Sequence, residues 1–349
     1  MAEETGRLAY CNLPAVTPRQ LPPGLGMPHT EALVQTVTKW INGTTLTYCF
    51  VRIGQSGWPQ AQMEVVHRAF QQWKALGIGL DFAETADKKD ATLLIGLVPG
   101  DGSWSYVGTD VLKNRNHGRN MNFGWDLTTT WGHATALHEI GHALGMPHEH
   151  QNPKSGIVWN ESKVLEYFSQ SPNNWDEKTI RWNILRHLSP AEVEGSNWDP
   201  GSIMHYPFDR GLISAPPPYD TDGVPSNVEL SKNDQQWIQR FYPPLAPATP
   251  IQINTLAPIA TKIAAQSDFI FTPAETRSYR LQAVGEADLK LGLLEQTEDG
   301  ALTVLQVEDD SATASNAAIT RELEKGKHYR LSARMHYTNH PGGAALTVF

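Results

Sequence analysis

The 349-residue chain has only two cysteines, Cys11 and Cys49, which excludes a small scaffold held together by several disulfides. Its longest strongly apolar stretch, residues 91–98, is far shorter than the roughly 20 residues that span a bilayer. Lys and Arg (28) are outnumbered by Asp and Glu (37), so the net charge is −9. This balance argues against a nucleic-acid-binding surface and against a polybasic membrane patch.

The N-terminus also lacks a visible signal peptide. Glu3 and Glu4 lie where such a peptide carries Lys or Arg, and no apolar segment follows them. The two cysteines could form one bridge or remain free thiols. The compartment is therefore only weakly defined by composition.

What the sequence does contain is enough apolar material for folded cores, with 40% hydrophobic residues and 11 Trp. The length favours two domains. Composition shifts predict four segments: a Pro- and Gly-rich leader (1–29), a mixed α/β domain (30–245), a Pro-rich linker (246–260) and an all-β sandwich (261–349). In the last segment, apolar and polar residues alternate with period two.

Local patterns predict the elements of the first domain. Apolar spacing favours a helix over residues 62–76, and β-rich runs favour strands at 46–51, 80–83 and 91–98, with an edge strand at 120–125. Residues 128–130 offer an N-cap for a helix that continues through Leu144. After Pro147 the pattern is irregular, with helical pieces expected at 163–168, 175–185 and 234–241. The fold class is therefore predicted as α+β, with a mixed sheet.

The segment with the clearest chemistry is HEIGHALGMPHE, residues 138–149. His138 and His142 are one helical turn apart, so both imidazoles leave the same face and can chelate Zn²⁺. Gly145 can adopt a positive φ and end the helix, which lets His148 return as a third ligand. Three histidines leave one coordination position open, as in a catalytic zinc site. Glu139 can reach a water at that position.

Two other histidines are candidates for the ligand set. His150 is a rival third ligand, but its offset from His142 does not fit the turn. His133 lies five residues before His138 and therefore off the ligand face. Neither is expected to bind the metal.

The segment resembles the metzincin pattern HExxHxxGxxH, and the following Glu149 is similar to the astacin family within that clan. Three further motifs support the resemblance in the expected order: Ser202–Tyr206 (SIMHY) resembles the astacin Met-turn, Trp104–Gly108 (WSYVG) an astacin strand, and Leu230, Ser231, Asp234 and Tyr242 the closing helix. The likeness covers roughly residues 30–245. It implies a metzincin-type catalytic domain with an active-site helix and an irregular lower half.

The resemblance implies a zinc endopeptidase with one Zn²⁺ per chain, and Glu139 as general base and acid. It also implies that Tyr206 stabilises the oxyanion, that Met204 forms an apolar floor beneath the ligands, and that Glu149 orients groups around the site. Substrate is expected along an edge strand within residues 103–125. Departures exist: the chain lacks four cysteines for two catalytic-domain disulfides, and His150-Gln151-Asn152-Pro153 replaces the usual continuation. We therefore expect a divergent, microbial- or fungal-type member.

Cys11 in the leader has three possible roles. Its thiolate could occupy the open zinc position and keep the enzyme latent, as cysteines do in matrixins and some astacin-like proteins. It could instead be a free exposed thiol or pair with Cys49, although Cys49 lies in a predicted strand and is most simply a small core residue.

The C-terminal segment loosely resembles sandwich domains appended to secreted microbial proteases, and could bind substrate or a surface. Asp309 and Asp310 could hold Ca²⁺, but a solvated turn is the preferred interpretation. The alternative function is a non-enzymatic binding or adhesion protein that presents the sandwich; a zinc hydrolase of non-peptide amides is a third. We expect a protein or peptide substrate, a monomer, no nucleic acid and no membrane span. The resemblance implies an extracellular location, while the missing signal peptide leaves the cytoplasm open.

Overall fold

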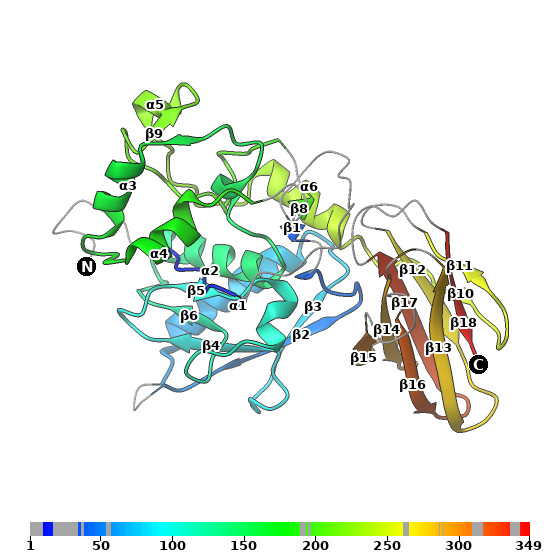
Figure 1. Ribbon diagram of the computed structural model, residues 1–349. Coiled ribbons are helices and arrows are strands. Elements are labelled where there is room, and N and C mark those ends of the chain that lie inside the picture. Colours follow the sequence, from blue (N-terminus) through cyan, green and yellow to red (C-terminus); the bar gives the residue numbers. More distant parts are fainter. Residues whose placement is uncertain are drawn as a thin grey trace.

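The structure is a computed structural model that describes residues 10–16, 34–35, 38–53, 57–188, 193–194, 197–260, 265–285, 287, 289–308, 317–335 and 343–349. Most of the leader, and the Asp309–Asp310 pair considered for Ca²⁺, lie outside these ranges. Within them the chain forms an α/β region up to Tyr242 and a β-rich region from Thr249 onward (Figure 1).

The N-terminal region is built on a mixed sheet of five described strands. Their spatial order is β3 (Asp81–Glu84), β2 (Thr45–Phe50), β4 (Leu93–Leu97), β6 (Met121–Phe123) and β5 (Trp104–Ser105). The strands β3, β2, β4 and β6 run parallel to one another, and β5 runs antiparallel to β6. The segment at 120–125 was expected at the sheet edge, but β6 is internal and β5 is the edge strand. The reason is that the chain turns back after Ser105 to place β6 between β4 and β5.

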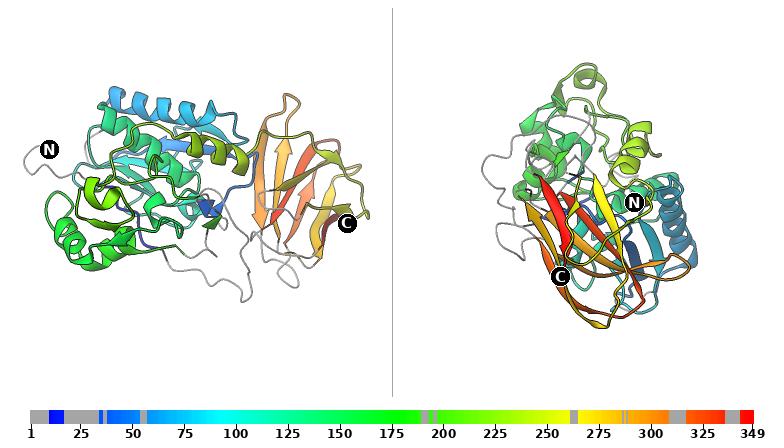
Figure 2. Two further views of the ribbon diagram at one scale, coloured as in Figure 1. Left: turned by 90° about the horizontal axis from the view of Figure 1, so that it is seen from above. Right: turned by 90° about the vertical axis from the view of Figure 1, so that its right-hand side faces the viewer.

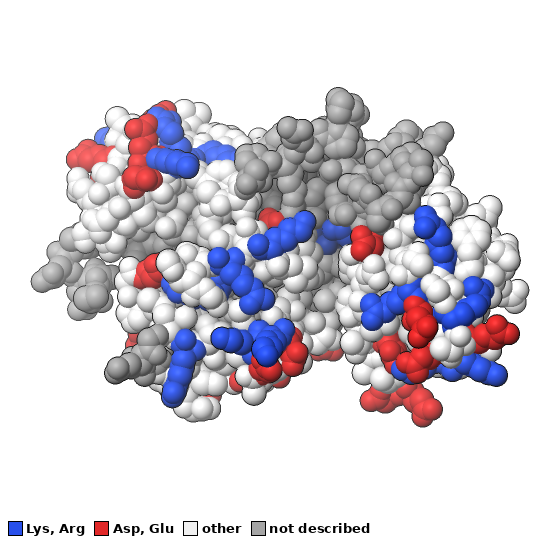
Figure 3. Space-filling model, turned by 60° about the horizontal axis from the view of Figure 1, so that its bottom comes forward, with Lys and Arg blue, Asp and Glu red and all other residues white. Residues whose placement is uncertain are grey.

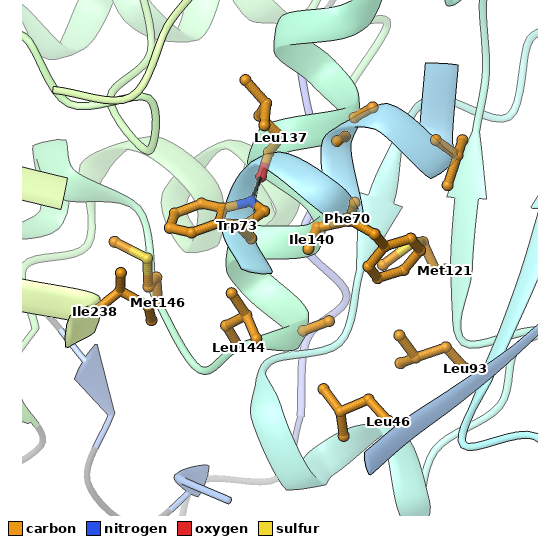
Figure 4. Close-up of a cluster of buried hydrophobic side chains, with 14 of the residues drawn as sticks. Leu46, Phe70, Trp73, Leu93, Met121, Leu137, Ile140, Leu144, Met146 and Ile238 are labelled. Atoms are coloured by element: carbon orange, nitrogen blue, oxygen red, sulfur yellow. Dashed lines mark hydrogen bonds between the residues drawn. The ribbon is translucent and has the colours of Figure 1, made fainter. Parts of the chain in front are cut away.

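Two long helices pack on this sheet, and the predicted positions of both are close to those observed. They are α1 (Gln60–Lys74) and α2 (Thr130–Ala143). The Thr129 side chain caps α2 by accepting from Gly132 N at 2.9 Å. Trp73 of α1 donates from Nε1 to the Leu137 carbonyl at 3.1 Å, within the apolar cluster of Figure 4. Helix α2 is therefore packed against α1 by a buried hydrogen bond and an apolar cluster, and another of its faces lines an open cavity.

The lower half of this region is irregular, as the sequence pattern indicated. It contains α3 (Glu161–Phe168), α4 (Glu177–Ile180), which continues into a π-helical turn to Leu185, α5 (Tyr219–Asp222) and the closing helix α6 (Lys232–Phe241). Two short strand pairs, β7 (Val158–Trp159) with β9 (Ile213–Ala215) and β1 (Val34–Gln35) with β8 (Val193–Glu194), tie loops together.

The C-terminal region is a sandwich of two sheets, which lie face to face in Figure 2. One has the order β10 (Thr249–Pro250), β12 (Gln266–Phe271), β17 (His328–Met335), β14 (Leu289–Gln296), β15 (Leu302–Glu308). The other has the order β11 (Ala257–Pro258), β18 (Ala344–Val348), β13 (Arg277–Gly285), β16 (Ala318–Leu323). Residues 246–260, expected as a linker, thus supply the edge strands β10 and β11.

The two regions meet through a polar interface at residues 39–43. The Gln266 side chain pairs with the backbone of Asn42, accepting from its N at 2.8 Å and donating to its O at 2.9 Å. Arg334 donates to the Lys39 carbonyl. Gly292 allows close approach, because a Cβ there would lie 3.0 Å from Ile41 Cγ2. These contacts join the sandwich to the segment that leads into the first sheet.

Surface charges are mixed. On the face drawn in Figure 3, basic and acidic side chains are intermixed over both regions. None of the helices in the described parts of the chain is long and apolar enough to cross a membrane.

Candidate active site

The C-terminal end of α2 redirects the chain as the glycine spacing predicted. Gly145 has φ +97°, and its N–H donates to the His142 carbonyl at 2.8 Å. The next residue, Met146, donates to the Gly141 carbonyl at 3.0 Å. This pair of bonds is a Schellman motif, which ends a helix with a left-handed residue. The reversal brings His148 back toward the face of α2 that carries the other two histidines.

The three histidines of residues 138–148 meet. One ring nitrogen from each histidine and the Cys11 sulfur all lie within 4.8 Å of one another, and all four residues are buried. The Nδ1 of His138 lies 2.8 Å from the Ile203 carbonyl, and the Nδ1 of His142 lies 2.7 Å from the Met146 carbonyl. Because a carbonyl can only accept, both Nδ1 atoms carry the proton and both Nε2 atoms present a lone pair.

Burial keeps these groups uncharged. It lowers the pKa of His138 to about 4 and lowers the pKa values of His142 and His148 well below their usual range. For the latter two, neighbouring histidines add to the effect. Neutral imidazoles are the form that binds metal.

The donor set fits a metal ion. The Nε2 of His138 is buried and has no hydrogen-bond partner within the described part of the chain, while the Nε2 atoms of His142 and His148 face each other at 3.1 Å. Buried lone pairs with no donor are costly unless something electron-poor binds them. Three imidazoles and one thiol are donors that Zn²⁺ prefers, so this cluster could hold such an ion.

Glu139 lies on the same side of the cluster and is completely buried. Its Oε2 accepts from the Cys11 thiol at 3.6 Å, and its Oε1 has no partner among the described residues. Burial raises the pKa of Glu139 to about 8, although the contact with Cys11 lowers it. A carboxyl group with a raised pKa can exchange a proton near neutral pH.

Two Met-turn residues, Tyr206 and Met204, lie close to the histidine cluster and to α2. Tyr206 donates its phenol proton to the Cys11 carbonyl at 2.6 Å, and burial raises its pKa well above the usual value. Met204 packs under α2, because a Cβ at Gly141 would lie 2.5 Å from the Met204 sulfur. Any larger residue at Gly141 would therefore require the Met204 side chain to move.

Glu149 lies beside the cluster without touching its donor atoms. Its Oε1 accepts from Asn152 Nδ2 and from Asp199 N, both at 3.0 Å, and its own N–H donates to the Met204 carbonyl at 3.0 Å. Burial raises the pKa of Glu149 to about 8. It therefore connects the returning chain after His148 to the Met-turn and to the 199 loop.

The two rival histidines point elsewhere. His150 Nε2 lies 2.8 Å from the Asn183 carbonyl, and His133 Nε2 lies 3.1 Å from Gln72 Oε1. Neither belongs to the metal-binding group found among the described residues.

The leader segment 10–16 crosses the cluster. Cys11 is buried and lies 3.6 Å from His142 Nε2; it is neither exposed nor bonded to Cys49, which is itself a free buried thiol. Burial and the adjacent Glu139 raise the pKa of the Cys11 thiol. The next residue, Asn12, donates its N–H to Ser103 O at 2.8 Å, beside the edge strand β5, and accepts from Asn183 Nδ2 at 3.1 Å.

Tyr10 is the residue that sequence reasoning missed. Its ring is 4% exposed and its hydroxyl donates to the Pro207 carbonyl at 2.9 Å. The only signal in the sequence was an aromatic residue next to a cysteine in an otherwise Pro-rich leader. That signal could not show which distant residues it contacts.

An open cavity lies beside the cluster. Its walls come from the cleft face of α2, from the Met-turn and the residue after it, and from the leader, and include Trp131, Ala134, His138, Ile203, Pro207 and Tyr10. No Lys, Arg or Asp side chain is among its described lining residues. The arrangement is therefore a cleft with a histidine cluster that could hold a metal ion, and with a carboxyl group and a phenol beside it, which are the groups that a metallopeptidase uses.

Comparisons with known proteins agree with this class. The family model of the astacin peptidases matches residues 32–212. A solved structure of myroilysin is 32% identical, with a TM-score of 0.55, and the match covers 62% of this chain and all of that one. A crystal structure of myroilysin is 31% identical over 59% of this chain and 86% of that chain, with a TM-score of 0.44. The chain belongs to the astacin family of peptidases.

Proposed function

We propose that the protein is a zinc endopeptidase that hydrolyses peptide bonds of extended protein substrates. One Zn²⁺ per chain would be held by the Nε2 atoms of His138, His142 and His148. The observation that carries this proposal is the meeting of three neutral imidazoles beside Glu139, whose Oε1 has no hydrogen-bond partner in the part of the chain that the structure describes. When bound, zinc supplies Lewis acidity to the water nucleophile and to the substrate carbonyl.

Glu139 is proposed as the general base and acid. Its carboxylate would take a proton from the attacking water and return it to the leaving amine. Its position supports this role, because Cys11 Sγ, which approaches the histidine cluster, lies 3.6 Å from its Oε2. A water in place of that sulfur would be within reach of the same carboxylate.

Tyr206 is proposed as a donor to the substrate carbonyl. Its hydroxyl already donates to a backbone carbonyl next to the cluster, that of Cys11. A substrate carbonyl at the same place would receive the same hydrogen bond, which becomes stronger as negative charge develops on the oxygen.

Met204, Glu149 and Gly145 are proposed to position these groups. Met204 would support the imidazoles from below, Gly145 would allow the return of His148, and Glu149 would fix the segment between them. We also propose that residues 30–245 form the peptidase domain and that the protein has an extracellular location.

Metal content together with hydrolysis of casein tests the function. The protein freed of residues 1–29 is expected to contain one zinc per chain and to lose hydrolysis with a chelator, and His142→Ala is expected to lose most of the zinc. His133→Ala is the matched control, because His133 lies on the same helix and contacts Gln72 instead. Full zinc content in His142→Ala would show that the ligands are misassigned.

We also propose that the leader holds the enzyme latent through Cys11. The thiolate would take the open position on the metal, at high effective concentration because it is tethered. The contacts of Asn12 with Ser103 and of Tyr206 with the Cys11 carbonyl support a leader that lies where substrate would.

Activity of three proteins tests the latency. The intact chain should be weakly active, whereas Cys11→Ala and the chain freed of residues 1–29 should be more active. Cys49→Ala is the control for loss of a buried thiol, since Cys49 lies in a separate apolar cluster. Equal activity of all forms would overturn the latency and leave the peptidase function standing.

A further inference from the structure

The leader has a second deeply buried side chain next to Cys11, and nothing in the metal chemistry requires it. Tyr10 lies within an aromatic cluster of the lower half of the N-terminal region. Its ring centroid is 4.9 Å from that of Phe168, 5.2 Å from that of Tyr206 and 6.4 Å from that of Phe208. The first two contacts are edge-to-face and the third is stacked, which are favourable arrangements of aromatic rings.

Polar contacts fix the same residue. The Tyr10 hydroxyl donates to the Pro207 carbonyl at 2.9 Å, and its backbone N–H donates to Asn173 Oδ1 at 3.1 Å. The walls therefore recognise the ring, the phenol and the backbone separately. They come from α3, from the loop that follows it, from Tyr206 of the Met-turn and from the two residues after it, and all of these belong to the proposed peptidase domain.

The position of this pocket relative to the reacting groups is defined by the next residue. The Cys11 carbonyl accepts from Tyr206 and the Cys11 sulfur lies 3.6 Å from His142 Nε2. A pocket for the neighbouring side chain is therefore one residue away from the point where the scissile carbonyl would lie. The open cavity beside it is lined by Tyr10 itself and by Pro207, so the space continues toward the cleft.

We propose that the pocket filled by Tyr10 is a substrate side-chain subsite, and that the processed enzyme prefers peptides with an aromatic residue, Tyr or Phe, within two residues of the scissile bond. This inference rests on the proposed function. When the leader leaves, a ring from the substrate takes the place of Tyr10, with the Pro207 carbonyl free to accept from a tyrosine hydroxyl. Burial of one ring corresponds to roughly 10–100-fold in affinity.

Binding tests the subsite without catalysis. The probe is a synthetic peptide of leader residues 9–16 with Cys11→Ser, and its partner peptide carries Tyr10→Ala in addition. Calorimetry on the chain freed of residues 1–29 and stripped of metal is expected to give roughly 10–100-fold tighter binding for the tyrosine peptide than for the alanine peptide. A third peptide, with Tyr10→Phe in place of Tyr10→Ala, should bind with an affinity between the two. Equal affinities for the Tyr and Ala peptides would overturn the subsite.

Cleavage of a peptide library by the same processed chain gives the second test. Tyr and Phe are expected to be enriched at one position within two residues of the cut. Phe168→Ala should reduce the Tyr-to-Ala preference ratio at that position about tenfold, and Phe168→Leu, which preserves more of the packing, should reduce it less. Trp175→Phe is the control, because the Trp175 ring stacks on Phe168, with ring centroids 5.4 Å apart, and makes no ring contact with Tyr10. The Tyr-to-Ala preference ratio of this variant should stay within about twofold of the wild type.

The outcomes separate the two proposals. Cleavage without aromatic preference, or a ratio that Phe168→Ala leaves unchanged, would overturn the subsite and keep the peptidase. A processed and metal-loaded chain that cleaves no peptide would overturn the peptidase function and the substrate preference with it.

Discussion

The cleft-facing side of α2 depends on nearby residues, whereas the last carbonyls of this helix are bound by distant ones. The cleft side depends on residues 138–148, in which one helical turn and one glycine reversal bring three histidines together. The last two carbonyls are bound by distant side chains. Trp40 Nε1 donates to the Ala143 carbonyl at 2.8 Å, and the Tyr242 hydroxyl donates to the Leu144 carbonyl at 2.9 Å. These bonds satisfy carbonyls that the helix itself leaves free.

The sandwich extends this distant support. Lys39, whose carbonyl accepts from Arg334, places its ammonium group 4.9 Å from the Phe241 ring and 5.5 Å from the Tyr242 ring. The C-terminal region therefore contacts the segment that caps the active-site helix. We therefore expect changes on the cleft side to alter catalysis with little effect on stability, and changes in the distant side chains that bind the Ala143 and Leu144 carbonyls to do the reverse.

The largest expected effect is on the cleft side. Glu139→Gln should retain zinc and the fold but lower kcat/KM of the processed enzyme by about 10²–10⁴-fold, because an amide cannot take the proton of the attacking water. Hydrolysis of a fluorogenic peptide and metal analysis check this. Near-wild-type turnover, or a marked loss of thermal stability, would contradict the division between the two sides of the helix.

A pH-dependent effect is expected where α6 supports the Met-turn. Asp234 accepts from Ser202 Oγ at 2.6 Å and Ile203 N at 2.8 Å, and burial raises its pKa from 3.8 to about 6. Since the pKa is raised in the folded chain, the stability due to this group is complete below about pH 4 and is lost as the pH rises through about 6. The loss amounts to roughly 3 kcal/mol at most, at 1.36 kcal/mol for each pKa unit.

Comparison with Asp234→Asn isolates this group. The difference in unfolding free energy between the wild type and this variant should decrease from pH 4 to pH 6 and be flat above that. Taking the difference removes the protonation of the histidines, which both proteins share. Urea unfolding across this pH range measures it, and a difference that increases with pH would show that the sign is wrong.

The same contrast explains what could be predicted from the sequence. The histidine cluster was predictable because its geometry follows from helical periodicity and one positive φ within residues 138–148. The β-rich nature of the C-terminal region was predictable from period-two alternation. Both are local properties of the chain.

Contacts between distant segments were not predictable. The place of Tyr10 against α3, and the pairing of Gln266 with Asn42, join residues more than 150 positions apart. The strands β10 and β11 were missed because their prolines suggested a linker, although proline is tolerated at sheet edges. For β6, the sequence pattern showed a strand but not its neighbours.

A smaller effect on chemistry is expected for Tyr206→Phe. Loss of one donor to the substrate carbonyl should lower kcat about 10–100-fold and leave KM little changed, because the hydrogen bond is strongest in the transition state. Steady-state kinetics of the processed enzyme separate the two parameters. A rise in KM at unchanged kcat would make Tyr206 a binding residue instead.

The smallest effect is expected for the distant side chains that bind the last carbonyls of α2. Tyr242→Phe removes the bond to the Leu144 carbonyl and the one that Tyr242 accepts from Trp40 N at 3.2 Å. The Leu144 carbonyl and the Trp40 N–H are then left buried without this hydrogen-bond partner, so the unfolding free energy should decrease by about 1–2 kcal/mol. Tyr279→Phe, which loses a single bond to the Glu275 carbonyl within the sandwich, is the control and should decrease it less. Urea unfolding followed by tryptophan fluorescence measures both. Zinc content and kcat/KM of Tyr242→Phe should stay within about threefold of the wild type, because the carbonyls of Ile203 and Met146, and not the Tyr242 hydroxyl, hold the Nδ1 atoms of His138 and His142. A large loss of zinc in this variant would mean that the cleft side of α2 and the distant support of its last carbonyls are coupled, and the distinction between them would fail.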